Sequence, residues 1–126
     1  MPCVAIVDDE EGIRKALRRL LRASGLDAEA YATGEEFLSA AGQKRPDCLV
    51  LDLHMPGMSG LQVLRKLKAT AEWLPVVMIT ADDEPETRKQ CMNAGADAYL
   101  RKPLQDGLLL TAISLAMRLR TPPSKG

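Results

Sequence analysis

Aromatic residues and net charge are both scarce in this sequence. Of its 126 residues one is Trp, two are Tyr and one is Phe, although 46% are hydrophobic, so the core must be aliphatic. Seventeen basic residues balance seventeen acidic ones. That balance leaves no electrostatic footprint for nucleic acid and no polybasic patch for a membrane surface. We therefore expect no direct nucleic acid binding by this chain.

Long apolar runs are also missing. No segment reaches the roughly 18 apolar residues of a membrane helix, and the N-terminus lacks a signal-peptide pattern. Cys3, Cys48 and Cys91 lie far apart without metal-ligand spacing, so we interpret them as free, largely buried thiols. These absences predict a cytoplasmic chain without membrane contact. A length of 126 residues suits one domain.

Short apolar runs alternate with longer amphipathic ones. The expected strands cover 3–7, 27–31, 48–51, 75–79 and 98–100. The expected helices cover 13–24, 33–41, 60–67, 84–94 and 105–119. Apolar strands linked by helices predict an α/β fold, a doubly wound five-stranded parallel sheet with helices on both faces. The domain is expected over 1–120, with 121–126 as a tail or the start of a linker.

The last expected helix has more apolar residues than one buried face can hold. One expected buried stripe comprises Leu108, Ala112, Leu115, Ala116 and Leu119. Three apolar residues lie outside that stripe: Leu109, Leu110 and Met117. Two interpretations of this surplus stay open, namely packing at the edge of the domain or a surface for a dimer or an effector.

Polar side chains stand at or just beyond the ends of four of the expected strands. Asp8 and Asp9 follow the first strand, Asp52 the third, Thr80 the fourth and Lys102 the fifth. In a parallel sheet these positions converge on the carboxyl edge. Three carboxylates there would repel one another by about 4 kcal/mol per close pair. A hard divalent cation such as Mg²⁺, together with the charge of Lys102, would compensate them.

This set of side chains predicts phosphoryl transfer onto a carboxylate. A carboxylate is a competent nucleophile towards phosphorus and forms an acyl phosphate. The transfer needs positioning and charge neutralisation, which Lys102 and the Thr80 hydroxyl can supply beside Asp52. Taken singly, each of these residues is more often a cap or turn residue. Their joint placement at successive strand ends favours a site.

Four motifs resemble the receiver domain of two-component response regulators, over nearly the whole chain from about residue 3 to 119. They are V-D-D-E (7–10), V-L-D-L-H-M-P-G-M-S-G (50–60), M-I-T-A (78–81) and A-Y-L-R-K-P-L (98–104). Their wording is similar to receivers of the nitrogen-fixation-regulator type. The resemblance implies a flavodoxin-like, CheY-like sheet of strand order 2-1-3-4-5. It also implies a cis bond before Pro103.

The resemblance assigns a role to each matching residue. Asp52 would be the phosphoacceptor, loaded by a sensor histidine kinase or a histidine phosphotransfer protein. Asp8, Asp9 and Asp52, with the backbone carbonyl of His54, would hold Mg²⁺ or Mn²⁺. Thr80 and Lys102 would contact the phosphoryl group. Such a domain is a signalling module rather than an enzyme, although it assists its own phosphorylation and autodephosphorylation.

The resemblance also implies how the signal is read out. Thr80 and Tyr99 would form a switch that changes the face made by the fourth helix, fifth strand and fifth helix. That face would then bind a partner or form a homodimer. Two functional classes stay open: a stand-alone switch, and the excised receiver of a longer DNA-binding transcriptional regulator. An inactive scaffold is disfavoured because every phosphorylation residue is present.

His54, the sole histidine, has two interpretations. Its ring could carry a phosphoryl group or bind a metal, or it could be an exposed loop side chain whose carbonyl alone matters. A single imidazole without a partner base favours the second interpretation. A phosphatase of the haloacid-dehalogenase type would need a second acidic residue two positions after its nucleophile. His54 occupies that position, so this class of enzyme is disfavoured. In the resembling family, the residues at His54 and Asp82 flank the route of the attacking water.

Overall fold

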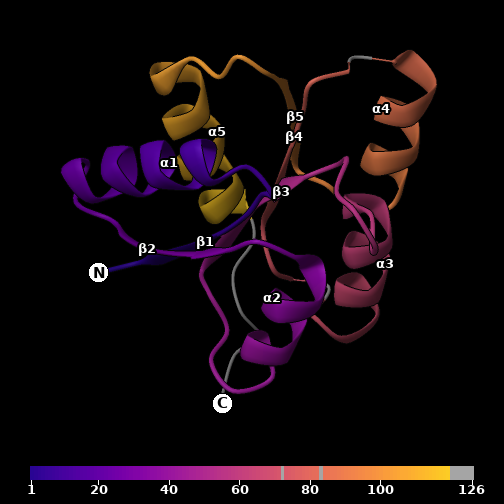
Figure 1. The fold of residues 1–126 in the computed structure, drawn as a ribbon, viewed down its shortest axis with the longest axis horizontal. Helices are drawn as coiled ribbons and strands as arrows, with labels where there is room; N and C mark the ends of the chain where they lie inside the picture. The colour runs from indigo at the N-terminus through magenta and orange to yellow at the C-terminus, as the bar shows by residue number, and fades with distance from the viewer. Residues whose placement is uncertain (72, 83, 120–126) are drawn as a thin grey trace.

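Strands and helices alternate through the described part of the chain in a computed structural model (Figure 1). The structure describes residues 1–71, 73–82 and 84–119, so the expected tail over 121–126 lies outside the described residues. The strands are β1 (Cys3–Val7), β2 (Asp27–Tyr31), β3 (Cys48–Asp52), β4 (Val76–Thr80) and β5 (Ala98–Arg101). The helices are α1 (Glu11–Ala23), α2 (Gly34–Ala41), α3 (Gly60–Thr70), α4 (Pro85–Asn93) and α5 (Asp106–Leu119).

The strands form one parallel sheet in the order β2-β1-β3-β4-β5. Its register pairs Asp52 with Ile79 and Thr80 with Arg101, so the strands end at one edge. Helices α1 and α5 cover one face, and α2, α3 and α4 cover the other (Figure 1). This arrangement confirms the predicted doubly wound fold and its strand order.

Aliphatic side chains fill the space between the sheet and each helical layer. Every residue of β3 and β4 is buried, as continuous apolar strands require when helices cover both faces. The Cys48 and Cys91 thiols are free and buried, whereas the free thiol of Cys3 is partly exposed. Two layers of aliphatic packing therefore hold the central strands, which carry Asp52 and Thr80, in fixed register.

Helix α5 buries a different face from the one we predicted. Leu109, Ile113 and Ala116 are buried, at the four- and three-residue spacing of one helical face. Leu108 and Leu115 were predicted to be buried, and they are 56% and 50% exposed instead. The prediction was right for Ala116 and wrong for Leu108 and Leu115. Two adjacent stripes of this helix are apolar, and only its orientation on the sheet decides which one is covered.

No helix in the described ranges combines the length and the apolar character needed to cross a membrane.

Candidate functional site

Buried polar side chains gather at the carboxyl edge of the sheet. Within the described ranges, the side chains of this kind are Asp8, Asp52 and Thr80. They follow or end β1, β3 and β4 respectively. These three polar side chains therefore meet at the carboxyl edge of the sheet, as the order of strands and polar residues in the sequence predicted. Burying such groups is costly unless they have partners or a ligand.

Asp8 is held by the first turn of the neighbouring helix. Its Oδ1 accepts a hydrogen bond from the Glu10 backbone N–H at 2.9 Å, and its backbone carbonyl accepts one from Arg14 Nη1 at 2.8 Å. Its other oxygen, Oδ2, is buried, and among the described residues its one partner is the Lys102 ammonium. Asp8, Asp9 and Asp52 each offer a carboxylate oxygen, and these oxygens lie within 4.8 Å of one another.

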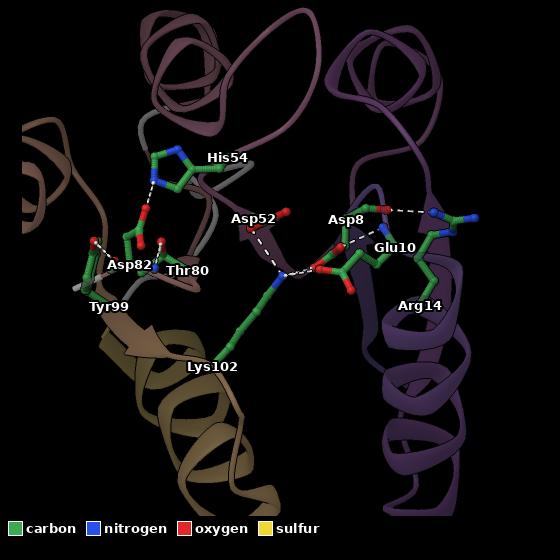
Figure 2. A network of polar contacts seen from close by, with 9 residues as sticks. All are labelled: Asp8, Glu10, Arg14, Asp52, His54, Thr80, Asp82, Tyr99 and Lys102. Atoms are coloured by element: carbon green, nitrogen blue, oxygen red, sulfur yellow. Dashed lines mark hydrogen bonds and ion pairs between the residues drawn. The ribbon is translucent and has the colours of Figure 1, made fainter. Parts of the chain in front are cut away.

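Lys102 reaches into the carboxylate cluster from the loop after β5 (Figure 2). Its Nζ lies 2.9 Å from Asp8 Oδ2, 3.4 Å from Asp52 Oδ1 and 3.7 Å from Glu10 Oε1. Burial lowers the pKa of this lysine, but the hydrogen bond that it donates to Asp8 and the charges of the three carboxylates outweigh burial and raise the pKa. Lys102 therefore keeps its positive charge in the resting site. The peptide bond between Lys102 and Pro103 is cis, as the resemblance implied.

Asp52 is a carboxyl group in an unfavourable place for a negative charge. Burial and the neighbouring Asp8 charge raise its pKa from 3.8 to about 7, against the lowering effect of Lys102. The backbone beside it is also crowded, since a Cβ on Gly60 would meet the Asp52 carbonyl oxygen and Leu53 Cα. Glycine at this position lets the start of α3 lie against the end of β3, with Ser59 as the helix cap.

Thr80, Tyr99 and Asp82 are linked on the β4 side of the site (Figure 2). The Asp82 backbone N–H donates to Thr80 Oγ1 at 3.1 Å, and the Tyr99 hydroxyl donates to the Asp82 carbonyl at 3.2 Å. Tyr99 is buried, and the Arg88 guanidinium lies 5.7 Å from its ring centroid. The Tyr99 ring is therefore in an inward position, joined to Thr80 through one residue.

His54 projects from the loop after β3 with a largely exposed ring. Its Nε2 lies 3.5 Å from Asp82 Oδ2, so the two side chains meet at the carboxyl edge of the sheet (Figure 2). The resemblance implied that both residues lie beside the site, but not that they contact each other. Glu10 was not predicted as a site residue, although it stands directly after Asp8 and Asp9 in an acidic turn.

The fold and its acidic edge define a class: a CheY-like receiver domain, with a doubly wound sheet and a carboxylate cluster at the strand ends. The chain belongs to the response regulator receiver domain family, whose model matches residues 4–114. It is thus a receiver domain of two-component response regulators, a signalling domain rather than an enzyme of the ordinary kind.

Curated relatives and solved structures agree with this assignment. Response regulator MprA of Mycobacterium sp. (strain KMS) is 39% identical over 123 residues, which cover 98% of this chain and 53% of the relative. The Mycobacterium leprae protein of that name is 41% identical over 95% of this chain and 52% of its own length. The chain thus spans about half the length of these relatives.

Two solved structures share the fold along most of their length. Vibrio cholerae chemotaxis protein CheY4 has a TM-score of 0.87 at 29% identity, covering 92% of this chain and 98% of that one. A CheY-like receiver domain protein from Methanospirillum hungatei has a TM-score of 0.90 at 28% identity, covering 94% and 95%. The likeness therefore extends over the sheet and its covering helices.

Proposed function

We propose that this receiver accepts a phosphoryl group on Asp52 from a phosphohistidine of a sensor histidine kinase or a histidine phosphotransfer protein. The observation that carries the proposal is the Asp52 carboxylate, which offers an oxygen within 4.8 Å of oxygens of Asp8 and Asp9 and has Lys102 Nζ 3.4 Å from its Oδ1. Such a carboxylate is a nucleophile with both charge-neutralising partners beside it. A receiver of this kind works where kinases use ATP, so we place it in the cytoplasm.

The acidic residues fit a hard divalent cation, Mg²⁺ or Mn²⁺. Asp8 Oδ2 is a buried oxygen whose one partner among the described residues is the Lys102 ammonium, and Asp8 belongs to a set of three carboxylates that each offer an oxygen within 4.8 Å of the others. Asp8, Asp9 and Asp52 would hold the ion, with the His54 carbonyl as a further oxygen. The bound ion would offset the carboxylate charge and that of the phosphoryl oxygens.

The remaining residues position the reacting groups. An Asp52 oxygen attacks phosphorus, the bond from phosphorus to the donor imidazole nitrogen breaks, and its electron pair leaves with that nitrogen. Lys102 would turn from Asp8 and Asp52 to a phosphoryl oxygen, and the Thr80 hydroxyl would donate to another. His54 and Asp82, paired near the acceptor, would limit the approach of the water that hydrolyses the acyl phosphate during autodephosphorylation.

Incubation with acetyl phosphate tests the proposal directly. In the presence of Mg²⁺, the intact mass of the chain should increase by one phosphoryl group, because the site activates the transfer itself. Removing the metal with EDTA should reduce labelling by roughly a hundredfold, since the carboxylates would then repel the donor. A wild-type chain that gains no phosphoryl group with Mg²⁺ present would contradict the proposal.

Asp9→Ala should weaken Mg²⁺ binding by roughly tenfold or more, because it removes one of the three proposed carboxylate ligands. Glu86→Gln, at an exposed position on α4, is the matched surface control and should bind Mg²⁺ as wild type does. Isothermal titration calorimetry is the suitable measurement. Trp73 precedes β4, at the opposite end of that strand from Thr80, so its fluorescence is a poor reporter. Equal affinity of Asp9→Ala and wild type would remove Asp9 from the ligand set.

The proposed output is a change at the face made by α4, β5 and α5. Phosphorylation would draw Thr80 towards the phosphoryl group and so break its hydrogen bond with Asp82, whose carbonyl holds Tyr99. Exposed Met92 on α4, with Leu108 and Leu115 on α5, provides apolar contact area on these elements. This exposure supports use of the face for a partner or a homodimer.

A second candidate function is that of the input domain of a longer DNA-binding transcriptional regulator. The length of the MprA relatives, about twice the matched segment, favours it. In that case the α4-β5-α5 face would act on an attached output domain. The intact mass of the native protein distinguishes this candidate from a stand-alone switch.

A further inference from the structure

Glu10 is an acidic residue at the rim of the site, and it is not one of the carboxylates that we propose to hold the divalent cation. Its Oε1 lies 3.7 Å from Lys102 Nζ, and its side chain is 63% exposed, whereas the Asp8 side chain is fully buried. It is not among the carboxylates whose oxygens lie within 4.8 Å of one another. Glu10 therefore contributes charge at the rim of the site without a place in the cation-binding set.

Apart from its ion pair with Lys102, the Glu10 carboxylate has no structural role in the described residues. Glu10 is the N-cap residue of α1, but its side chain makes no capping hydrogen bond. The turn is held instead by its backbone N–H, which donates to Asp8 Oδ1, and by its carbonyl, which accepts from the Arg14 backbone N–H at 3.1 Å. A glutamine at this position would keep both backbone bonds and remove only the charge.

The position of that charge has a consequence for Lys102. The Nζ group has three carboxylates within reach, yet it must turn to the phosphoryl oxygens during the proposed transfer. Glu10 draws the ammonium towards the rim, and its negative charge also repels an entering donor in proportion to the donor's own charge. A dianionic donor is opposed more strongly than a donor with one net negative charge.

We propose that Glu10 is a positioning and specificity-determining residue, which acts through Lys102 and disfavours highly charged small phosphoryl donors. This inference rests on the proposed function and adds a preference for donor charge to it. Acyl phosphates such as acetyl phosphate, which are dianions at neutral pH, form the disfavoured class. N-phosphoryl donors with a protonated nitrogen, such as phosphoramidate, form the tolerated class. The residue thereby protects Asp52 from phosphorylation by metabolic acyl phosphates.

The test compares two isosteric charge removals at adjacent positions. Glu10→Gln should increase the rate of labelling by acetyl phosphate roughly three- to tenfold and the rate with phosphoramidate less than about twofold. The gain should shrink at high salt, because the charge lies at the surface. Glu11→Gln removes a charge that pairs with Lys15 instead, and it should label as wild type does. Glu10→Asp should restore the wild-type donor preference. Intact mass over time at saturating Mg²⁺ gives each rate.

Two further measurements separate a charge effect from a structural one. Calorimetry without donor should show that Glu10→Gln weakens Mg²⁺ binding less than roughly threefold, far less than Asp9→Ala. Urea unfolding should give the Glu10 and Glu11 variants equal stability. Equal acceleration with both donors, or equal acceleration by Glu11→Gln, overturns the role of Glu10 and leaves the proposed function standing. A wild-type chain that is not labelled by either donor overturns the proposed function and this inference with it.

Discussion

Asp52→Asn should lose phosphoryl labelling by at least about a hundredfold while folding more stably than wild type. An amide has no nucleophilic oxygen of comparable strength, so no acyl phosphate forms at this position. At the same time, the substitution removes a buried negative charge that faces Asp8. A gain in stability together with a loss of labelling would identify a carboxylate kept for function at the expense of stability.

The pH dependence of unfolding shows whether the charged form of Asp52 stabilises or destabilises the folded state. The folded state binds the Asp52 proton up to a pKa of about 7, whereas the unfolded chain releases it near the ordinary value of 3.8. Between these two values the folded state holds more protons, so wild-type stability falls as the pH rises. Asp52→Asn should remove that decline and leave the variant more stable at pH 8 by about 2–4 kcal/mol.

Urea unfolding at pH 5 and pH 8 in EDTA measures this difference. Glu86→Gln, which removes an exposed carboxylate on α4, should keep the wild-type pH slope and so serves as the control. An Asp52→Asn variant that is less stable than wild type at pH 8 would contradict the burial argument. A variant that is labelled as readily as wild type would remove Asp52 from its proposed role.

The strand-end residues could be predicted from the sequence because position and chemistry coincide in them. The apolar run before Asp52 and the one before Thr80 have the length and composition of buried strands, and each stops at a polar residue. In a parallel sheet such ends must share an edge. The meeting of Asp8, Asp52 and Lys102 therefore followed from topology, although no distance between them did.

Other features depended on geometry that a one-dimensional pattern does not contain. Leu108 and Leu109 are equally apolar neighbours, and the orientation of α5 buries one and exposes the other. Glu10 lies in a turn that brings its carboxylate back towards Lys102, a residue 92 positions later. The pair of His54 and Asp82 likewise joins two loops whose approach depends on how β3 and β4 end. Such contacts are set by packing rather than by periodicity.

Lys102→Met should destabilise the metal-free chain by about 3–5 kcal/mol, because the buried Asp8 carboxylate would lose its counter-ion. Asp8 Oδ2 forms its closest ion pair with Lys102, at 2.9 Å, and the Asp8 side chain has no exposure to water. Methionine keeps most of the aliphatic stem, so the change tests the charge rather than the packing. Lys15→Met, which removes an exposed partner of Glu11, should cost at most about 1 kcal/mol.

Mg²⁺ should reverse much of this loss, because a cation that binds the folded state takes over the neutralisation of the carboxylates. Unfolding by urea with and without Mg²⁺ should therefore show a larger metal-dependent gain in Lys102→Met than in wild type. The same variant should remain slow in labelling by acetyl phosphate even with Mg²⁺ present, since the proposed contact with the phosphoryl oxygen is lost. Recovery of stability without recovery of labelling would separate two tasks of Lys102: balancing the resting carboxylates and receiving the phosphoryl group. Recovery of both would assign it the first task alone.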